Sequence, residues 1–511
     1  MASRTFTGRT VLYTDEAQVD NSNIAAVLEQ AVKDNEQNIS DIKYLYEYFK
    51  GKQPILERTK TYNDEINNKI VENRAAEIVS FKTGYLLSAP IQYIDAANND
   101  LTETIDTSDL AKLSKWCEME GKSTSDLEIA QWQSICGTAF RWIFPKSDEE
   151  KLSEEDSPFE FETLDPQTTF VVYSSRMGHK PLLGVTFVTL EDESMRYYCY
   201  TDKEFFILDK DYKPVSDEID KPGSHTMGAI PIVEYPANMS RIGDVEVVVS
   251  LLDAINNVQS NRADGVEQII QSILCMEGMA IETGANKSQT QAESDFMKQL
   301  KEVGGLLLPE GAKAYYLTNQ LNQGDTQTYK DDLYDAVLTI SGMPNRNASA
   351  STGDTGSAVM LRDGWSAAES RARNTEIFFK KSERKFLNIL ITIANEAGGT
   401  NILPADVDIR FPRRNYTNDS ANVSNLVTML SSDWIRPEFA YEHCNMTADP
   451  HKDYLLAKEW HDNQQNETAD ALASLNAEQA DADEHTDEQG DTSQAAEDNV
   501  NAANNTTGRV I

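Results

Sequence analysis

Few residues of this sequence have the spacing that catalysis requires. Gly121, Lys122 and Ser123 match the end of a phosphate-binding loop, in which backbone N–H groups and a lysine hold nucleotide phosphates. Such a loop needs a glycine five residues before Gly121, and Trp116 occupies that position. Residues 112–120 also have the pattern of a helix, not of the strand that leads into such a loop. We therefore interpret Gly121 as a helix-ending glycine and predict no nucleotide site.

The histidines and carboxylates lack the spacing of a metal or catalytic site as well. The sequence has no HExxH motif and no His/Cys cluster at zinc spacing; His443, Cys444 and His451 come closest. Acidic pairs such as Asp331 and Asp332 carry little information, because 84 of the 511 residues are Asp or Glu. We predict no catalytic residue, metal or cofactor, and expect surface or core roles for all six histidines: His179, His225, His443, His451, His461 and His485.

The charge balance argues against tight binding of nucleic acid. The chain has 46 Lys and Arg against 84 Asp and Glu, a net charge of −38, whereas proteins that grip DNA regardless of sequence present basic surfaces. Residues 461–511 hold 12 acidic residues and one basic residue, which is −11 of the total and leaves −27 for residues 1–460. Any DNA that meets this protein is expected to be guided, not held.

Cysteine usage and hydropathy indicate a cytosolic setting. The five cysteines are far apart, odd in number and free of any CxxC motif, which suits reduced thiols. The first ten residues lack the apolar core of a secretory signal, and no apolar run approaches the ~18 residues that span a bilayer. We expect a soluble protein without a direct membrane role.

The residue patterns divide the chain into helical and sheet regions, an α+β class. Residues 1–40 are polar, with a weak helical pattern at 24–32, and predict a loosely ordered arm. Helical patterns dominate 41–135, and short aromatic or β-branched runs between 138 and 235 predict an antiparallel sheet. Residues 405–411 could return as a strand to that sheet, helices are expected over 417–460, and the acidic composition beyond Trp460 predicts disorder.

Three long helical patterns follow the predicted sheet. Apolar residues recur at i, i+3/i+4 spacing from Asp244 to Met276, roughly 50 Å of helix, and a second amphipathic pattern covers about 326–341. The polar stretch between them contains two short strand-like runs, 304–308 and 313–317, so we expect a helical hairpin with a small sheet at its tip. A third helix of about 60 Å is predicted over 357–397, after a segment without periodicity at 342–356.

Three sequence blocks, in order, carry a family resemblance. They are residues 44–93, with an aromatic and glycine pattern; 228–260, with a Pro-bounded strand, an Asn-containing turn and a long helix; and 341–383, with a polar loop and a long helix. Together they resemble the portal proteins of long-tailed double-stranded DNA bacteriophages, over most of residues 40–415.

The resemblance implies a portal fold with named parts. These would be an N-terminal arm (1–40), a wing (41–240), a first stem helix (241–276), a clip (277–323), a second stem helix (324–341), a channel loop (342–356), a long helix with a return strand to the wing (357–415), a helical crown (416–460) and a disordered acidic tail (461–511).

The resemblance also implies a function and partners. The chain would form a homo-oligomeric ring, dodecameric in virions, at one vertex of the capsid, and would be assembled in the host cytoplasm. Double-stranded DNA would pass through the ring during packaging and ejection. The large terminase subunit, the major capsid and scaffolding proteins, and head-completion adaptors at the clip would bind to it.

The segment 342–356 is the one candidate DNA-contacting site. In a ring, identical loops would project into the channel and offer small amides, hydroxyls and one cation to phosphates, a contact without a strong electrostatic grip. An ordinary surface linker is the alternative. The candidate residues are Asn345, Arg346, Asn347, Ser349, Ser351 and Thr352.

The predicted long helix concentrates cations, which four acidic residues partly offset. We expect intersubunit or intrahelical ion pairs, and a DNA track is the weaker interpretation. The cations are Arg362, Arg371, Arg373, Lys380, Lys381, Arg384 and Lys385, and the acids are Asp363, Glu369, Glu376 and Glu383.

Two other classes of protein stay open from the residues alone. One is another structural protein of the phage head or connector, although such proteins are usually shorter and would leave the helical hairpin unexplained. The other is a carboxylate- or metal-dependent phage hydrolase, which predicts a monomer or dimer.

Overall fold

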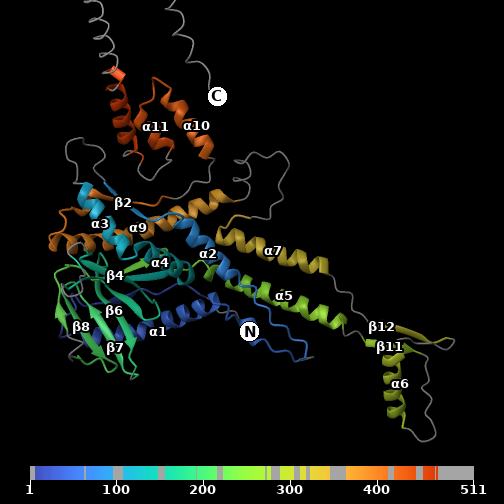
Figure 1. Cartoon of the computed structure of the whole chain (residues 1–511). Coiled ribbons are helices and arrows are strands. Elements are labelled where there is room, and N and C mark those ends of the chain that lie inside the picture. The colour runs from blue at the N-terminus through green and yellow to red at the C-terminus, as the bar shows by residue number, and fades with distance from the viewer. Residues whose placement is uncertain are drawn as a thin grey trace, which may run out of the picture. The chain divides into compact units, whose positions relative to one another are not determined.

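The structure is a computed structural model of the whole chain (Figure 1). It describes residues 6–469 except 62–64, 96–106, 148–152, 154–155, 192, 216–221, 271–272, 278–287, 304–310, 318–322, 346–363, 413–418, 445–449, 451–452 and 467. The chain divides into two compact units, Met1–Asn418 and Asp419–Ile511. The first unit mixes helices and sheets, in agreement with the predicted α+β class.

The N-terminal region is packed into the first unit, so the predicted loose arm over residues 1–40 is wrong for its described part. Strand β1 (Leu12–Thr14) pairs in parallel with β5 (Thr169–Ser174). Helix α1 (Ile24–Phe49) buries one face from end to end. Its apolar residues Ile24, Val27, Leu28 and Ala31 contact the sheet, so tertiary packing stabilises a helix whose composition is largely polar.

Two sheets stand where the sequence predicted one antiparallel sheet. The larger has the order β1-β5-β6-β7-β8-β9. Its β1–β5 pair is parallel, and each of its other neighbouring pairs is antiparallel. The smaller has the order β10-β3-β4 and is antiparallel. The remaining strands are β3 (Thr138–Pro145), β4 (Phe159–Leu164), β6 (Pro181–Thr189), β7 (Met195–Tyr200), β8 (Glu204–Asp209), β9 (Gly223–Ser224) and β10 (Ile232–Pro236).

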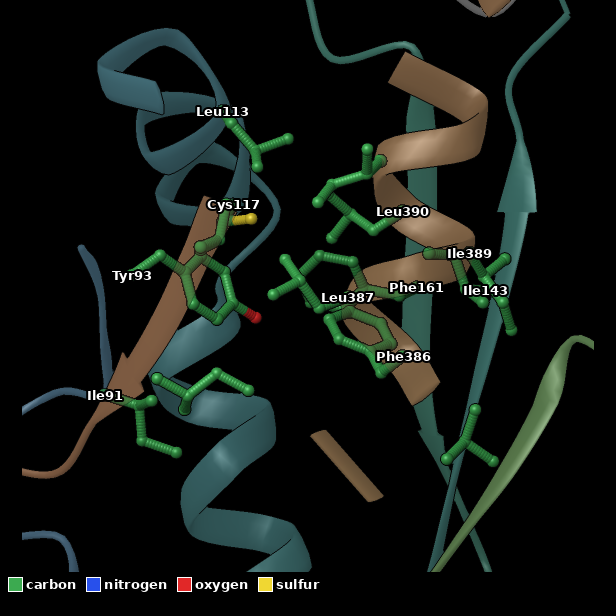
Figure 2. Close-up of a cluster of buried hydrophobic side chains, with 14 of the residues drawn as sticks. Ile91, Tyr93, Leu113, Cys117, Ile143, Phe161, Phe386, Leu387, Ile389 and Leu390 are labelled. Carbon is green, nitrogen blue, oxygen red and sulfur yellow. The ribbon is translucent and has the colours of Figure 1, made fainter. Parts of the chain in front are cut away.

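The main core of this unit surrounds helix α9 (Trp365–Glu396). It is built with α2 (Arg74–Leu86), α3 (Thr107–Met119), α4 (Lys122–Cys136) and the smaller sheet. Figure 2 shows Phe386, Leu387 and Leu390 of α9 facing Tyr93 and Cys117 on the neighbouring elements. Helix α9 begins after Gly364, and the first residues of the predicted 357–397 helix lie outside the described residues.

The predicted first stem helix is too long at its C-terminal end. After the short helical turn η2 (Glu246–Val248), helix α5 (Val249–Ile270) spans 22 residues, about 33 Å. Residues Ile273–Glu277 instead form β11, which pairs antiparallel with β12 (Lys313–Leu317). The apolar residues of β11 continue the helical periodicity of the sequence, but their backbone finds a cross-strand partner instead.

The hairpin itself is present. Helix α7 (Gln323–Ser341) packs along α5, and the two helices lead to β11, β12 and the helix α6 (Gln289–Val303) (Figure 1). Helix α6 occupies a stretch that the sequence analysis treated as a polar tract. The strand-like run 304–308 lies outside the described residues.

The predicted return strand pairs outside the two larger sheets. Strand β13 (Val407–Arg410) pairs with β2 (Gln92–Asp95) in a separate two-stranded antiparallel sheet. The prediction of a strand was right and its assignment to the antiparallel sheet was wrong. Two short 3-10 turns, η1 (Pro54–Glu57) and η3 (Pro404–Asp406), complete the described elements of this unit.

The second unit is helical in its described residues. It contains α10 (Asp419–Leu430), α11 (Pro437–Cys444) and a helical stretch over 453–466. That stretch crosses residue 461, the predicted start of the disordered tail. The predicted tail from residue 470 onward lies outside the described residues.

Candidate functional site

The residues that resembled a nucleotide site have a structural role. Gly121 has φ of 72° and separates α3 from α4, as expected for a helix-ending glycine. Lys122 is 5% exposed and belongs to a buried ion network. Within the described ranges, no group of three His, Cys, Asp or Glu side chains could hold a metal ion.

The buried ion network centres on Glu383 of α9. Its carboxylate lies 2.8 Å from Lys122 Nζ and 3.3 Å from Arg141 Nη1, and it accepts hydrogen bonds from the hydroxyls of Tyr93 (2.6 Å) and Tyr235 (2.8 Å). Asp126 binds the same two cations, Lys122 at 2.6 Å and Arg141 at 2.5 Å. Two cations therefore face two carboxylates across α4, α9 and β3.

The electrostatics of this network fix its protonation state. Burial alone would raise the pKa of Glu383, but Lys122 and Arg141 lower it to about 2. Burial raises the pKa of Tyr93 and of Tyr235 well above the ordinary value. None of these three groups changes charge near neutral pH, so the arrangement suits a fixed connection between elements and not proton transfer.

The predicted DNA-contacting residues are only partly described. Asn345 donates a hydrogen bond from Nδ2 to Asp335 Oδ1 of α7 at 3.2 Å. Arg346, Asn347, Ser349, Ser351 and Thr352 lie outside the described residues. The structure describes the chain on both sides of the undescribed stretch, up to Asn345 and again from Gly364.

The first end leaves a firmly capped helix. Gly342 has φ of +69° and donates its N–H to Thr339 O at 3.2 Å, while Met343 N–H donates to Leu338 O at 2.9 Å. This is a Schellman motif, and Leu338 and Met343 supply its hydrophobic contact inside one buried cluster. The chain therefore departs from α7 at a fixed point.

Arg371 of α9 braces that cap. Its Nη1 donates to the carbonyl of Ile340 at 2.6 Å, in the last turn of α7, where a cation also opposes the helix dipole. A Cβ on Gly342 would overlap the Arg371 side chain. The left-handed backbone thus favours glycine at 342, and a larger residue there would also displace the Arg371 side chain from Ile340.

The described chain resumes at Gly364, close to the end of α7. Gly364 has φ of +87° and precedes the first turn of α9. A Cβ at Gly364 would lie 3.8 Å from the Cα of Pro344. Trp365 then packs its ring 6.1 Å from those of Phe81 and Tyr85 on α2. Pro344 and Gly364 thus lie close together where α7 ends and α9 begins, an anchored place that we call the loop base.

Two cations of α9 pair with carboxylates of the same helix. Arg373 pairs with Glu369 at 2.9 Å and Lys380 with Glu376 at 2.8 Å, both at i,i+4 spacing, so the intrahelical interpretation is confirmed for these two. Arg384 donates to the carbonyls of Pro404 and Val407. Arg362 lies outside the described residues.

Sequence reasoning missed the Glu383 network and the role of Arg371. A signal existed for the network: Glu383 lies between Phe379 and Phe386 on the apolar stripe of α9, and Arg141 lies inside an otherwise apolar strand. A charge at such a position usually has a buried partner. No comparable signal marks Arg371, because its partner is a backbone carbonyl.

Comparison with known proteins identifies the family. Residues 28–482 match the family model described as phage portal protein, SPP1 Gp6-like. The chain belongs to this family of phage portal proteins. A curated relative, the portal protein of Clostridium phage phiCD119, is 26% identical over 249 residues, 46% of this chain and 51% of the relative. The match thus spans about half the length of that relative.

The extent of the family match agrees with two features of the fold. It begins inside α1 and so includes residues that the sequence analysis had assigned to a loose arm. It also reaches both units of the chain. Within the described part of the chain, no helix has the length and apolar character to cross a membrane.

Proposed function

We propose that the chain is the subunit of a closed ring, dodecameric in the virion, at one vertex of a phage head. The family match over residues 28–482 carries this proposal. The ring is the conduit for double-stranded DNA in packaging and ejection. Closure requires a heterologous interface, in which one face of each subunit fits the opposite face of its neighbour.

In this proposal each part of the chain has a place in the ring. Helices α5 and α7 form the stem, β11, β12 and α6 form the clip, the two larger sheets with α1 to α4 form the wing, and α10 and α11 belong to the crown. The clip receives head-completion adaptors. The large terminase subunit, the major capsid protein and scaffolding proteins are further partners, and the chain itself is a structural component, not an enzyme.

The segment 342–356 contacts the DNA in this proposal. The loop base supports this role, because it anchors the chain on α7 where this segment begins and on α9 at Gly364, beyond its end. The net charge of −38 per subunit keeps the duplex off the walls over a Debye length of ~8 Å, so that only short polar contacts form.

Native mass measurement and negative-stain images of the purified protein test the ring. A closed ring of about a dozen subunits with a hole wide enough for duplex DNA is expected. A monomer or dimer that persists at high protein concentration and high salt would refute the ring and favour the hydrolase alternative. Rings too narrow for duplex DNA would favour another connector protein.

Deleting Asn345 to Gly353 tests the loop. Rings should persist, since Pro344 and Gly364 already lie close together and a shorter connection can join them. Packaging or retention of DNA should fall. Unchanged genome length and phage yield would refute the assignment, and the substitution Arg346→Ala separates the effect of the one loop cation from that of loop length.

A further inference from the structure

An extended segment before α2 lies along the two helices of the hairpin. Residues Ile66–Arg74, which we call the clamp, use alternate backbone N–H groups to bind side chains that are four residues apart on α5. The three bonds are Asn68 N–H to Asp264 Oδ1 (2.7 Å), Ile70 N–H to Ser260 Oγ (3.0 Å) and Glu72 N–H to Asn256 Oδ1 (2.8 Å).

The spacing of these bonds follows from backbone geometry. Two residues of extended chain advance about 6.6 Å, and four residues of α-helix advance about 6.0 Å. The two repeat distances nearly match, so an extended segment and a helix can form several such hydrogen bonds in succession. Asn256 and Ser260 are fully buried and Asp264 is 3% exposed, so each of these acceptors would be costly to leave without its donor.

The clamp holds α7 as well. Lys330 Nζ of α7 lies 2.9 Å from the Glu72 carboxylate. One turn further along, the Tyr334 hydroxyl donates to Glu77 Oε1 at 2.9 Å, and the Arg74 guanidinium lies over the Tyr334 ring, 4.2 Å from its centre. Both helices of the hairpin are thus bound to one short stretch of chain.

Asn256 also connects the clamp to α1. Its Nδ2 donates to Gln53 Oε1 at 2.5 Å, and Gln53 donates to Asn73 Oδ1 at 3.0 Å. Asn73 caps α2 and donates to the carbonyl of Phe49 at the end of α1. A continuous set of side-chain amides, of which Asn256 and Gln53 are buried, therefore joins α5 to the end of α1 and the start of α2.

We propose that the clamp positions the stem of the ring, and that Asn256 is its central positioning residue. This inference rests on the proposed function, since it assumes that α5 and α7 are the stem. Apolar packing between α5 and α7 keeps the two helices together, whereas the hydrogen bonds of the clamp set the direction of the pair against the wing. A uniform stem direction is what lets identical subunits close a ring.

Asn256→Ala is the test, with Asn257→Ala as its matched control. Asn257 is exposed, and its Nδ2 donates to the carbonyl of Asp253, one turn earlier on α5, at 2.9 Å. Hydrogen exchange of the assembled protein should be about tenfold faster or more at Glu72 in Asn256→Ala, because the Glu72 N–H then loses its one buried acceptor. Averaged images should show blurred stem density beside a sharp wing.

A third variant separates an effect on the direction of the stem from a general loss of protein stability. Val185→Ala removes buried side-chain volume from the larger sheet, away from the clamp, and should lower the melting temperature without blurring the stem. Ser260→Ala should have the corresponding effect at Ile70, whose N–H binds Ser260 Oγ, and Ser260→Thr, which keeps the hydroxyl, should restore slow exchange there.

Two results would overturn the inference. One is equal exchange at Glu72 in Asn256→Ala and Asn257→Ala. The other is a stem as sharp in Asn256→Ala as in the unaltered protein. Failure of the proposed function gives a different result, because the unaltered protein would then form no ring while the exchange difference between the two asparagine variants would remain.

Discussion

Glu383→Gln should be among the most destabilising isosteric substitutions in this chain. The change keeps the shape of the side chain and removes one negative charge. Lys122 and Arg141, which are 5% and 0% exposed, would then share Asp126 as their remaining carboxylate. A buried cation that loses its partner cannot recover the solvation that it gave up on folding.

Two independent considerations give the size of the effect. A pKa lowered from 4.5 to about 2 corresponds to about 3 kcal/mol of preferential stabilisation of the ionised Glu383. Breaking one member of a buried ion pair typically costs about 3–5 kcal/mol. We therefore expect the free energy of unfolding of the first unit to fall by about 3–5 kcal/mol.

Equilibrium urea unfolding at pH 7, followed by circular dichroism at one protein concentration, measures this difference. Glu376→Gln is the control, since Glu376 lies two turns earlier on α9 and pairs with the partly exposed Lys380. Such pairs contribute under about 1 kcal/mol. If Glu383→Gln costs no more than Glu376→Gln, the network does not hold α9 in place.

Three further predictions concern acid stability, glycines and the loop base. The folded-state pKa of Glu383 lies below its unfolded value, so the stabilisation that ionised Glu383 provides is present above about pH 4.5 and is lost toward pH 2. The urea midpoints of the unaltered protein and of Glu383→Gln should therefore converge as the pH falls over this range. A constant difference between the two midpoints would contradict this prediction. Gly137→Ala should destabilise the protein by several kcal/mol, because Gly137 has φ of +81° and the added Cβ would overlap the Arg241 backbone. Gly84→Ala should instead stabilise it by about 0.5–1 kcal/mol in thermal unfolding, because Gly84 lies inside α2 with open space around it. Arg371→Ala should speed hydrogen exchange at Gly342 and Met343, and Arg373→Ala, two residues along α9, should not; equal rates would show that Arg371 does not brace the cap.

Helical periodicity predicted α7 and α9 well because each has an apolar stripe of ordinary spacing and a glycine at one or both ends. It failed at Ile273–Glu277, where the same apolar residues serve a strand, because the partner strand lies some 40 residues away and periodicity is a local signal. It also underrated residues 12–40, since β1 and α1 are stabilised by a sheet that follows them in the chain.

The candidate site also has one part that the sequence indicated and one part that it did not. The segment 342–356 stands out in the sequence because it lacks periodicity, and Gly342 at its start is the glycine that caps α7. Gly364, which precedes α9, was instead predicted to lie inside the long helix. The clamp was not predicted, although Asn256, Ser260 and Asp264 form a polar row at four-residue spacing in an otherwise amphipathic helix. Such a row is equally typical of a solvated helix face, and only the structure shows that it is buried against backbone N–H groups.

The equal spacing of the clamp and α5 has a mechanical consequence. A slide of α5 by half a turn would leave all three clamp N–H groups opposite no acceptor, so small displacements are resisted. A slide of one full turn would restore the match, because Gln268 is the next residue of the row after Asp264 and also carries an acceptor. The contact between α5 and the clamp therefore has preferred positions about 6 Å apart along the helix axis. A force applied along the stem must break the clamp hydrogen bonds before α5 can move from one position to the next.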